Sequence, residues 1–124
     1  MIRSVRSGGM FVGDQDRAKR FWTETIGFDL VRDVPMGEDE GTRRWIEVAP
    51  PDHNVVLVLY TPVGSEGVVG TFSNVIFDCD DVPGTYEELR AKGVEFVDTP
   101  REESLGWWAS FKDPDGNTYG LGRR

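Results

Sequence analysis

The sequence predicts an α+β fold, in which two tandem βαβββ modules form a cupped, half-barrel mixed sheet. The main observation is an internal repeat, since segments 45–54 and 108–117 carry Trp, Pro, Asp and Asn at matching positions. Each copy has the composition of a strand that ends in a tight turn, because Pro presets φ and Asp and Asn bond to nearby backbone. A stretch with helical spacing of apolar residues precedes each copy and ends at a glycine, Gly27 or Gly93. A unit that occurs twice in this order indicates an internal duplication.

The first module covers about residues 1–62. Asp14 has the position of a helix N-cap, and Gly27 that of a C-cap residue, for a helix over 15–26. Apolar and polar residues alternate in the segments around this helix, as in strands with one buried face. The predicted strands are 4–12, 28–31, 44–48 and 55–60.

The second module, about residues 70–124, repeats this order. Asp80 or Asp81 is expected to cap its helix, with Pro83 near the first helical position. The predicted strands are 72–79, 94–97, 105–112 and 118–121. Residues 61–70 carry three glycines and a proline and form the predicted linker within a single domain of 124 residues.

Composition excludes several classes of protein. The net charge of −8 argues against nucleic acid as a partner, because phosphate binding requires a basic surface. No apolar run has the length of a signal peptide or a membrane span. Cys79 is the only cysteine, so no internal disulfide forms, and we expect a cytoplasmic protein. His53, the only histidine, lies in the first turn and is expected to be an exposed surface residue.

Several motifs resemble the vicinal oxygen chelate superfamily, which includes glyoxalase I, extradiol dioxygenases and bleomycin-resistance proteins. They are segments 12–14, 17–22 and 26–28 in the first module, and 80–82, 86–94 and 111–117 in the second. The resemblance covers nearly the whole chain and implies that the two modules form a cup. It also implies a divalent metal in that cup, held by His and Glu side chains from the first and last strands of each module.

The positions that match the family's metal ligands hold other residues here. They are Ser7, Leu57, Asn74 and Gly120. These side chains cannot supply the imidazole and carboxylate groups that a catalytic divalent ion requires. A shift of one residue in any strand does not restore the set, so we expect neither a metal nor another cofactor.

Strand alternation predicts which side chains line the cup instead. The candidate ligand-binding residues are Phe11, Trp45, Glu47, Leu57, Leu59, Asn74, Asp78, Trp108 and Ser110, with Ile76 beside them. Indole rings and carboxylates together suit a flat, cationic ligand held by stacking and cation–π contacts. The alternative interpretation is that Trp45 and Trp108 only fill the space between the half-barrels.

Three functions follow from these observations. The first is a metal-independent protein, rather than an enzyme, that sequesters a drug or metabolite and resembles bleomycin-resistance proteins. The second is a glyoxalase- or dioxygenase-like lyase or oxidoreductase with a divalent metal, which the family resemblance implies. The third is a metal-free enzyme in which Glu47 or Asp78 acts as general acid or base. A homodimer is expected in each case, because such modules leave sheet edges and apolar faces to cover.

Overall fold

The computed structural model describes residues 1–37, 41–61, 69–70 and 72–123. The chain divides into two compact units, Met1–Val69 (unit 1) and Gly70–Arg124 (unit 2). The predicted linker over 61–70 and the acidic segment 38–40 lie largely outside the described residues. Each unit contains one mixed sheet and one helical segment, which confirms the predicted α+β class. Unit 1 has the predicted βαβββ order, and unit 2 has the same order with one additional short strand, Arg101–Glu103.

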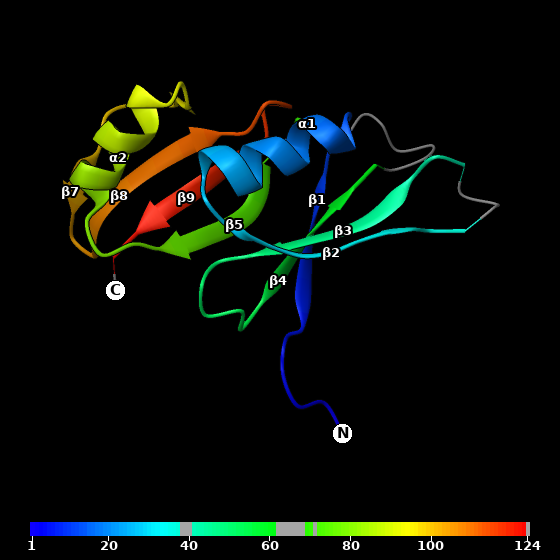
Figure 1. The fold of residues 1–124 in the computed structure, drawn as a ribbon. Helices are drawn as coiled ribbons and strands as arrows, with labels where there is room; N and C mark the ends of the chain where they lie inside the picture. Colours follow the sequence, from blue (N-terminus) through cyan, green and yellow to red (C-terminus); the bar gives the residue numbers. More distant parts are fainter. Residues whose placement is uncertain (38–40, 62–68, 71, 124) are drawn as a thin grey trace. The chain divides into compact units, whose positions relative to one another are not determined.

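Unit 1 contains four strands in the order β1-β4-β3-β2 (Figure 1). Its elements are β1 (Ser7–Phe11), α1 (Gln15–Arg20), the π-helical turn η1 (Phe21–Thr25), β2 (Asp29–Pro35), β3 (Arg44–Ala49) and β4 (Val56–Tyr60). Strands β1 and β4 are parallel, whereas β3 is antiparallel to both of its neighbours. Strand β2 is longer than expected, because its exposed charged residues still pair with β3 through the backbone.

The helix of unit 1 begins and ends where the sequence predicts. The Asp14 carboxylate accepts a hydrogen bond from the Arg17 backbone N–H at 3.0 Å, which satisfies one of the free donors of the first turn. Helical geometry then continues through η1, and Gly27, with φ of 91°, ends it.

Helix α1 packs against one face of the unit 1 sheet. Side chains from β1, β3 and β4 on that face are almost fully buried: Met10, Ile46, Val48, Leu57 and Leu59, together with Ala18 and Trp22 of the helical segment. Gln15 fixes the helix start to the sheet, because its amide Nε2 donates to the carbonyls of Arg44 at 2.7 Å and Leu59 at 2.9 Å. Its Oε1 accepts from the Arg44 N–H at 3.0 Å, so the side chain satisfies three backbone groups at once.

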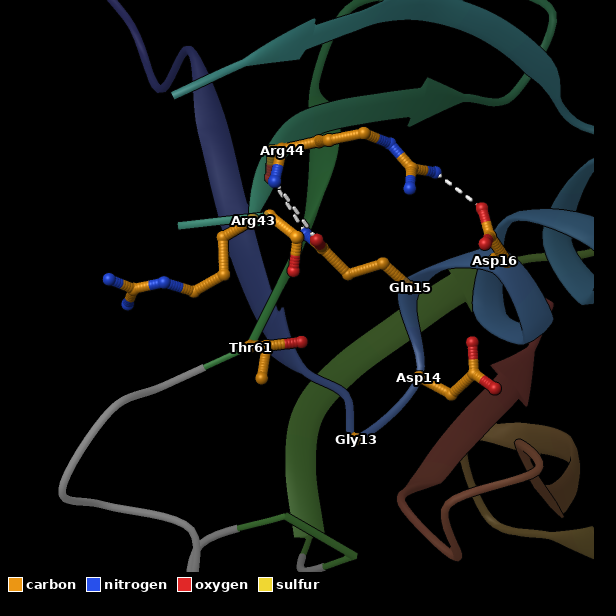
Figure 2. A pocket seen from close by; sticks show the side chains of 8 residues that line it. Gly13, Asp14, Gln15, Asp16, Arg43, Arg44 and Thr61 are labelled. Atoms are coloured by element: carbon orange, nitrogen blue, oxygen red, sulfur yellow. Dashed lines mark hydrogen bonds and ion pairs between the residues drawn. The ribbon is translucent and has the colours of Figure 1, made fainter. Parts of the chain in front are cut away.

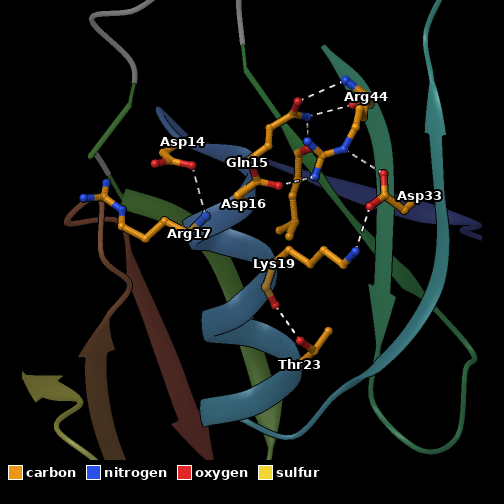
Figure 3. Close-up of polar contacts among 9 residues, drawn as sticks. Asp14, Gln15, Asp16, Arg17, Lys19, Thr23, Asp33 and Arg44 are labelled. Carbon is orange, nitrogen blue, oxygen red and sulfur yellow. Dashed lines mark hydrogen bonds and ion pairs between the residues drawn. The ribbon is translucent and has the colours of Figure 1, made fainter. Parts of the chain in front are cut away.

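An ion-pair network ties the same helix to β2 and β3 (Figure 3). The Asp33 carboxylate binds Lys19 Nζ and Arg44 Nε, each at 2.9 Å, and Arg44 Nη2 binds Asp16 at 2.7 Å. Burial alone would raise the pKa of Asp33, but the hydrogen bonds from Lys19 and Arg44 outweigh it and hold that pKa below its usual value. The network therefore favours the ionised carboxylate at neutral pH.

Unit 2 has the strand order β5-β9-β8-β6, with β7 also paired to β8. Its elements are β5 (Phe72–Asp78), α2 (Val82–Ala91), β6 (Glu95–Phe96), β7 (Arg101–Glu103), β8 (Gly106–Lys112) and β9 (Thr118–Gly122). Asp81 rather than Asp80 caps α2, and its carboxylate accepts from the Gly84 N–H at 3.0 Å. Strand β7 was missed because its three side chains are charged and exposed, so no apolar alternation marks it.

Aromatic rings build the core of unit 2. The cluster contains Phe77, Tyr86, Phe96, Phe111 and Tyr119, with neighbouring ring centroids 4.8 to 6.2 Å apart. Burial and the nearby Asp113 carboxylate raise the pKa of Tyr119 far above its usual range, so its hydroxyl stays protonated and donates to Asp113 at 2.7 Å. In the described part of the chain, no helix is both long and apolar enough to cross a membrane.

Candidate functional site

Trp45 and Glu47 lie on the face of the unit 1 sheet that is opposite α1. Arg44, Ile46 and Val48 alternate with them along β3, and Arg44 pairs with Asp16 of the helix. The predicted face of Trp45 and Glu47 is therefore confirmed. Met10 and Val12, from the alternating segment at the start of the chain, are buried at 2% and 0% exposure.

The predicted face of Leu57 and Leu59 is wrong. In the β3–β4 register, Leu59 lies opposite Ile46 and Leu57 lies opposite Val48, so both side chains lie on the helix-covered face. They are 4% and 0% exposed. The error is a shift of one residue, which moves every side chain of a strand to the other face. Val56 and Val58 are the β4 residues that share a face with Glu47.

A cavity of about 360 Å³ lies on the Trp45 face of unit 1. Its lining residues are Arg6, Arg32, Trp45, Glu47 and Val56. The Glu47 carboxylate is engaged at both oxygens: Oε2 accepts from Trp45 Nε1 at 3.2 Å, and Oε1 lies 3.4 Å from Arg32 Nε. The cavity therefore combines an indole ring with two guanidinium groups and one carboxylate.

A β-bulge places Arg32 in this cavity. The pairing between β2 and β3 passes from Leu30 opposite Val48 to Arg32 opposite Glu47, so Val31 is the extra residue. Simple alternation would have put Val31 opposite Glu47. Arg6 lies just before β1, where its backbone carbonyl accepts from the Val56 N–H at 3.2 Å. Arg6, Arg32 and Val56 were not among the residues predicted to line a site, and no alternation pattern marks the first two.

The second predicted tryptophan, Trp108, lies on a sheet face in unit 2. Trp108 pairs with Gly122 and Ser110 with Gly120, while Asp78 and Ile76 pair with the same two glycines from the other side of β9. These residues thus share one face, as predicted for Asp78, Trp108 and Ser110. Asp78 and Ile76 are exposed, and together with Gly122 they line a smaller cavity of about 230 Å³.

The Trp108 ring rests on glycine backbone. A Cβ atom added to Gly120 would lie 2.3 Å from Cη2 of Trp108, and one added to Gly122 would lie 3.4 Å from its Cε3. The indole therefore occupies the space directly above residue 120. Trp107 alternates to the other face and is exposed.

The two tryptophans of the repeat make equivalent hydrogen bonds. Trp45 Nε1 donates to Glu47, and Trp108 Nε1 donates to Ser110, each at 3.2 Å. In both units the acceptor is the side chain two residues further along the same strand. Each indole is thus held by its N–H while its ring stays half-buried, which leaves part of an aromatic surface accessible in each unit.

The other two predicted ligand-binding residues are accessible. Phe11 at the end of β1 is 42% exposed, and its ring centroid lies 6.3 Å from that of Tyr60. Asn74 is exposed and has a φ of 64°, at an irregularity in the pairing of β5 with β9. His53 is exposed, as expected, and its Nε2 lies 2.7 Å from Asp29 Oδ2.

The residues present do not fit the family's divalent metal. Position 120 is a glycine covered by the Trp108 ring, and Leu57 points to the helix-covered face. Ser7 and Asn74 offer no imidazole or carboxylate. Across the described residues, no three His, Cys, Asp or Glu side chains lie close enough together to hold a metal ion.

A third cavity, of about 400 Å³, lies at the start of α1 (Figure 2). Its lining residues are Gly13, Asp14, Gln15, Asp16, Thr42, Arg43, Arg44 and Thr61. Gln15 and Asp16 bind Arg44 there, so these groups serve the helix–sheet junction described above. None of the described residues that line this cavity is aromatic, which distinguishes it from the Trp45 cavity.

Residues 5–121 match the model of the Glyoxalase/Bleomycin resistance protein/Dioxygenase superfamily. The chain belongs to this superfamily. YetH of Bacillus subtilis (strain 168), described as uncharacterized, is 39% identical over 96% of this chain and 97% of its own length. Lactoylglutathione lyase GLX1 of Arabidopsis thaliana is 33% identical over 91% of this chain, which spans only 41% of that protein.

Solved structures give the same assignment. TnmS3, an antibiotic binding protein from Streptomyces sp. CB03234, is 35% identical, with a TM-score of 0.86 over 98% of this chain and 96% of its own. A superfamily member from Sphaerobacter thermophilus DSM 20745 is 28% identical, with a TM-score of 0.89 over 99% and 98% of the two chains. The superfamily thus includes both binding proteins and enzymes. Family membership alone does not give the function of this chain, which must be inferred from its own site residues.

Proposed function

We propose that this protein binds a flat aromatic small molecule without a metal, as a drug- or metabolite-sequestering protein. The observation that carries the proposal is the Trp45 cavity, where a half-buried indole lies beside charged side chains that can orient a ligand. The Trp108 ring on the face of unit 2 supplies a second aromatic surface. The similarity to an antibiotic binding protein supports the same function.

A second candidate is a glyoxalase-like lyase, because several relatives are named lactoylglutathione lyase. That function in this superfamily rests on a divalent metal, which the residues at positions 7, 57, 74 and 120 do not fit. A metal-free enzyme with Glu47 as general base is also less favoured, since both carboxylate oxygens already have partners. Asp78, the other carboxylate considered for that role, is exposed on its sheet face.

A metal titration distinguishes the two candidate functions, a metal-independent binding protein and a metalloenzyme. Protein purified without chelator should contain no stoichiometric metal, and nickel, zinc, manganese or ferrous iron should leave its thermal unfolding midpoint unchanged. This follows because a ligand that binds only the folded state must raise that midpoint. Tight stoichiometric metal would instead favour the lyase and call for an enzyme assay.

Ligand binding is tested by calorimetry with 2-naphthylmethanol, a neutral aromatic probe. Trp45→Ala should reduce the affinity at least about tenfold, since it removes the stacking surface of the cavity. Trp108→Ala tests the second surface, and Trp107→Ala is the matched control because Trp107 lies on the other face of β8. An affinity that is unchanged in both Trp45→Ala and Trp108→Ala would contradict the proposal.

Three further parts of the proposal come from the sequence alone. They are a positive charge on a ligand at the Trp108 face, a homodimer and a cytoplasmic location. Asp78, exposed on the Trp108 face, favours that positive charge in unit 2. Each of the three stays a prediction, and none of them concerns the charge of a ligand in the Trp45 cavity.

A further inference from the structure

We infer that the Trp45 cavity selects an aromatic ligand that carries an acidic group, such as a carboxylate or an ionised phenol. This inference rests on the proposed function and assigns the ligand's charge in unit 1. It differs from the sequence-based expectation, which relied on Glu47 to attract a cation. The observation behind it is the set of charged side chains that the structure brings together around Trp45.

The carboxylate of the cavity is already neutralised. Glu47 is only 12% exposed at its side chain, and its two oxygens are taken by Trp45 Nε1 and Arg32 Nε. A cationic ligand would have to compete with Arg32, whose guanidinium is part of the folded structure. Glu47 therefore acts on the ligand mainly by fixing the indole and Arg32 in place.

The cavity keeps an excess of positive charge and of N–H donors. Arg32 is 60% exposed at its side chain, so its guanidinium retains donors that face solvent. In the described part of the chain, no carboxylate pairs with the Arg6 guanidinium. Two guanidiniums against one carboxylate leave a local charge of +1, within a protein of net charge −8.

This combination suits a planar acid. An indole face and a valine provide apolar contact for a ring, and guanidinium groups bind carboxylates through paired N–H donors. Arg6 and Arg32 come from the segment before β1 and from β2, whereas Trp45 and Glu47 come from β3. A ring against Trp45 with its acidic group between the two arginines would use each of these groups.

Three probes of equal shape test the inference at neutral pH. They are 2-naphthoate, 2-naphthylmethylammonium and neutral 2-naphthylmethanol, each titrated by calorimetry. The naphthoate should bind about five- to tenfold more tightly than the other two, and 0.5 M NaCl should reduce this preference. Arg6→Gln and Arg32→Gln should each weaken naphthoate binding more than 2-naphthylmethanol binding, and so reduce the preference for the acid.

Arg3→Gln is the matched control, because Arg3 is an exposed arginine of the same N-terminal segment that does not line the cavity. It should retain the preference for naphthoate. Equal affinity for all three probes, or tighter binding of the ammonium, would overturn the inference but leave the proposed function standing. Failure of all three probes to bind would overturn both.

Discussion

Gly120 lies directly beneath the Trp108 indole, and its lack of a side chain lets that ring lie against β9. The same position corresponds to the family's last metal ligand, so one residue change accounts for both a missing carboxylate and the space that the ring fills. Glycine weakens a strand by itself, and its presence in β9 is explained by this close approach of the indole.

Gly120→Ala should therefore displace the Trp108 ring. The added methyl group would lie 2.3 Å from a ring carbon, so we expect a loss of about 1–3 kcal/mol in the free energy of unfolding and altered tryptophan fluorescence. Urea denaturation with fluorescence detection measures both. Gly122→Ala is the control, because its Cβ would meet the ring at an ordinary 3.4 Å. An equal loss of stability and an equal change in fluorescence in the two variants would contradict this role of Gly120.

The roles of some single residues can be predicted from the sequence, whereas those of others cannot. Asp14 was expected as a helix cap, and Asp81 was one of two candidates for the second cap, because a capping hydrogen bond needs only neighbours in sequence. Arg32 could not be assigned to the Trp45 cavity in this way. Its position depends on the bulge at Val31, which is set by the pairing of two strands.

At the scale of elements, the turn between β8 and β9 depends on Asp113. Its carboxylate accepts four hydrogen bonds: from the N–H groups of Asp115 and Asn117, from Asn117 Nδ2 and from the Tyr119 hydroxyl, at 2.7 to 2.9 Å. The repeat has Pro50 at the equivalent place, and the first turn relies on Asp52, which accepts from Asn54 at 3.1 Å. The two turns share a motif but differ in their hydrogen bonds.

Asp113→Asn should destabilise unit 2. An amide offers one acceptor oxygen where the carboxylate uses two, so buried donors lose their partner, at a cost of about 1–3 kcal/mol. Chemical denaturation measures the change. Asp52→Asn is the matched control in the exposed turn and should change stability by less than about 0.5 kcal/mol. An Asp113→Asn variant that is as stable as the parent protein would show that the turn does not need the carboxylate.

The ion pairs between α1 and the sheet should make the stability of the protein depend on pH. The folded state holds the pKa of Asp33 below its unfolded value of about 4, so the carboxylate adds stability above that value. This contribution is lost as pH falls through the lower, folded pKa. Asp33→Asn should thus be less stable than the parent at pH 7, and the difference should shrink steadily below about pH 4.

Thermal unfolding of both proteins between pH 2 and 7 tests this dependence. Asp16→Asn is the control, because Asp16 also pairs with Arg44 but is 66% exposed at its side chain. It should cause a smaller change, as exposed ion pairs contribute little. A difference between parent and Asp33→Asn that does not vary with pH would contradict the role given to the ionised carboxylate.

At the scale of the whole molecule, apolar side chains at the sheet ends bear on the predicted homodimer. Strand β2 is the last in its sheet and exposes Leu30, Val31 and Val34, and β5 is the last in its own and exposes Ile76 at 60%. A partner chain can cover such edges and the apolar side chains on them. The thermal unfolding midpoint should accordingly rise with protein concentration over a hundredfold range, as for a folded dimer. A constant midpoint would indicate a monomer.

The duplicated order of elements, the Asp14 helix cap and the face of each repeated tryptophan could all be predicted from the sequence. Those features arise from contacts between near neighbours or from a motif that occurs twice. Only the tertiary structure decided which face of β4 is buried and which cations surround Glu47. Both depend on the register between strands, and a shift or bulge of one residue reverses what each side chain contacts. The charge of the Trp45 cavity, and hence the class of ligand it suits, follows from that register.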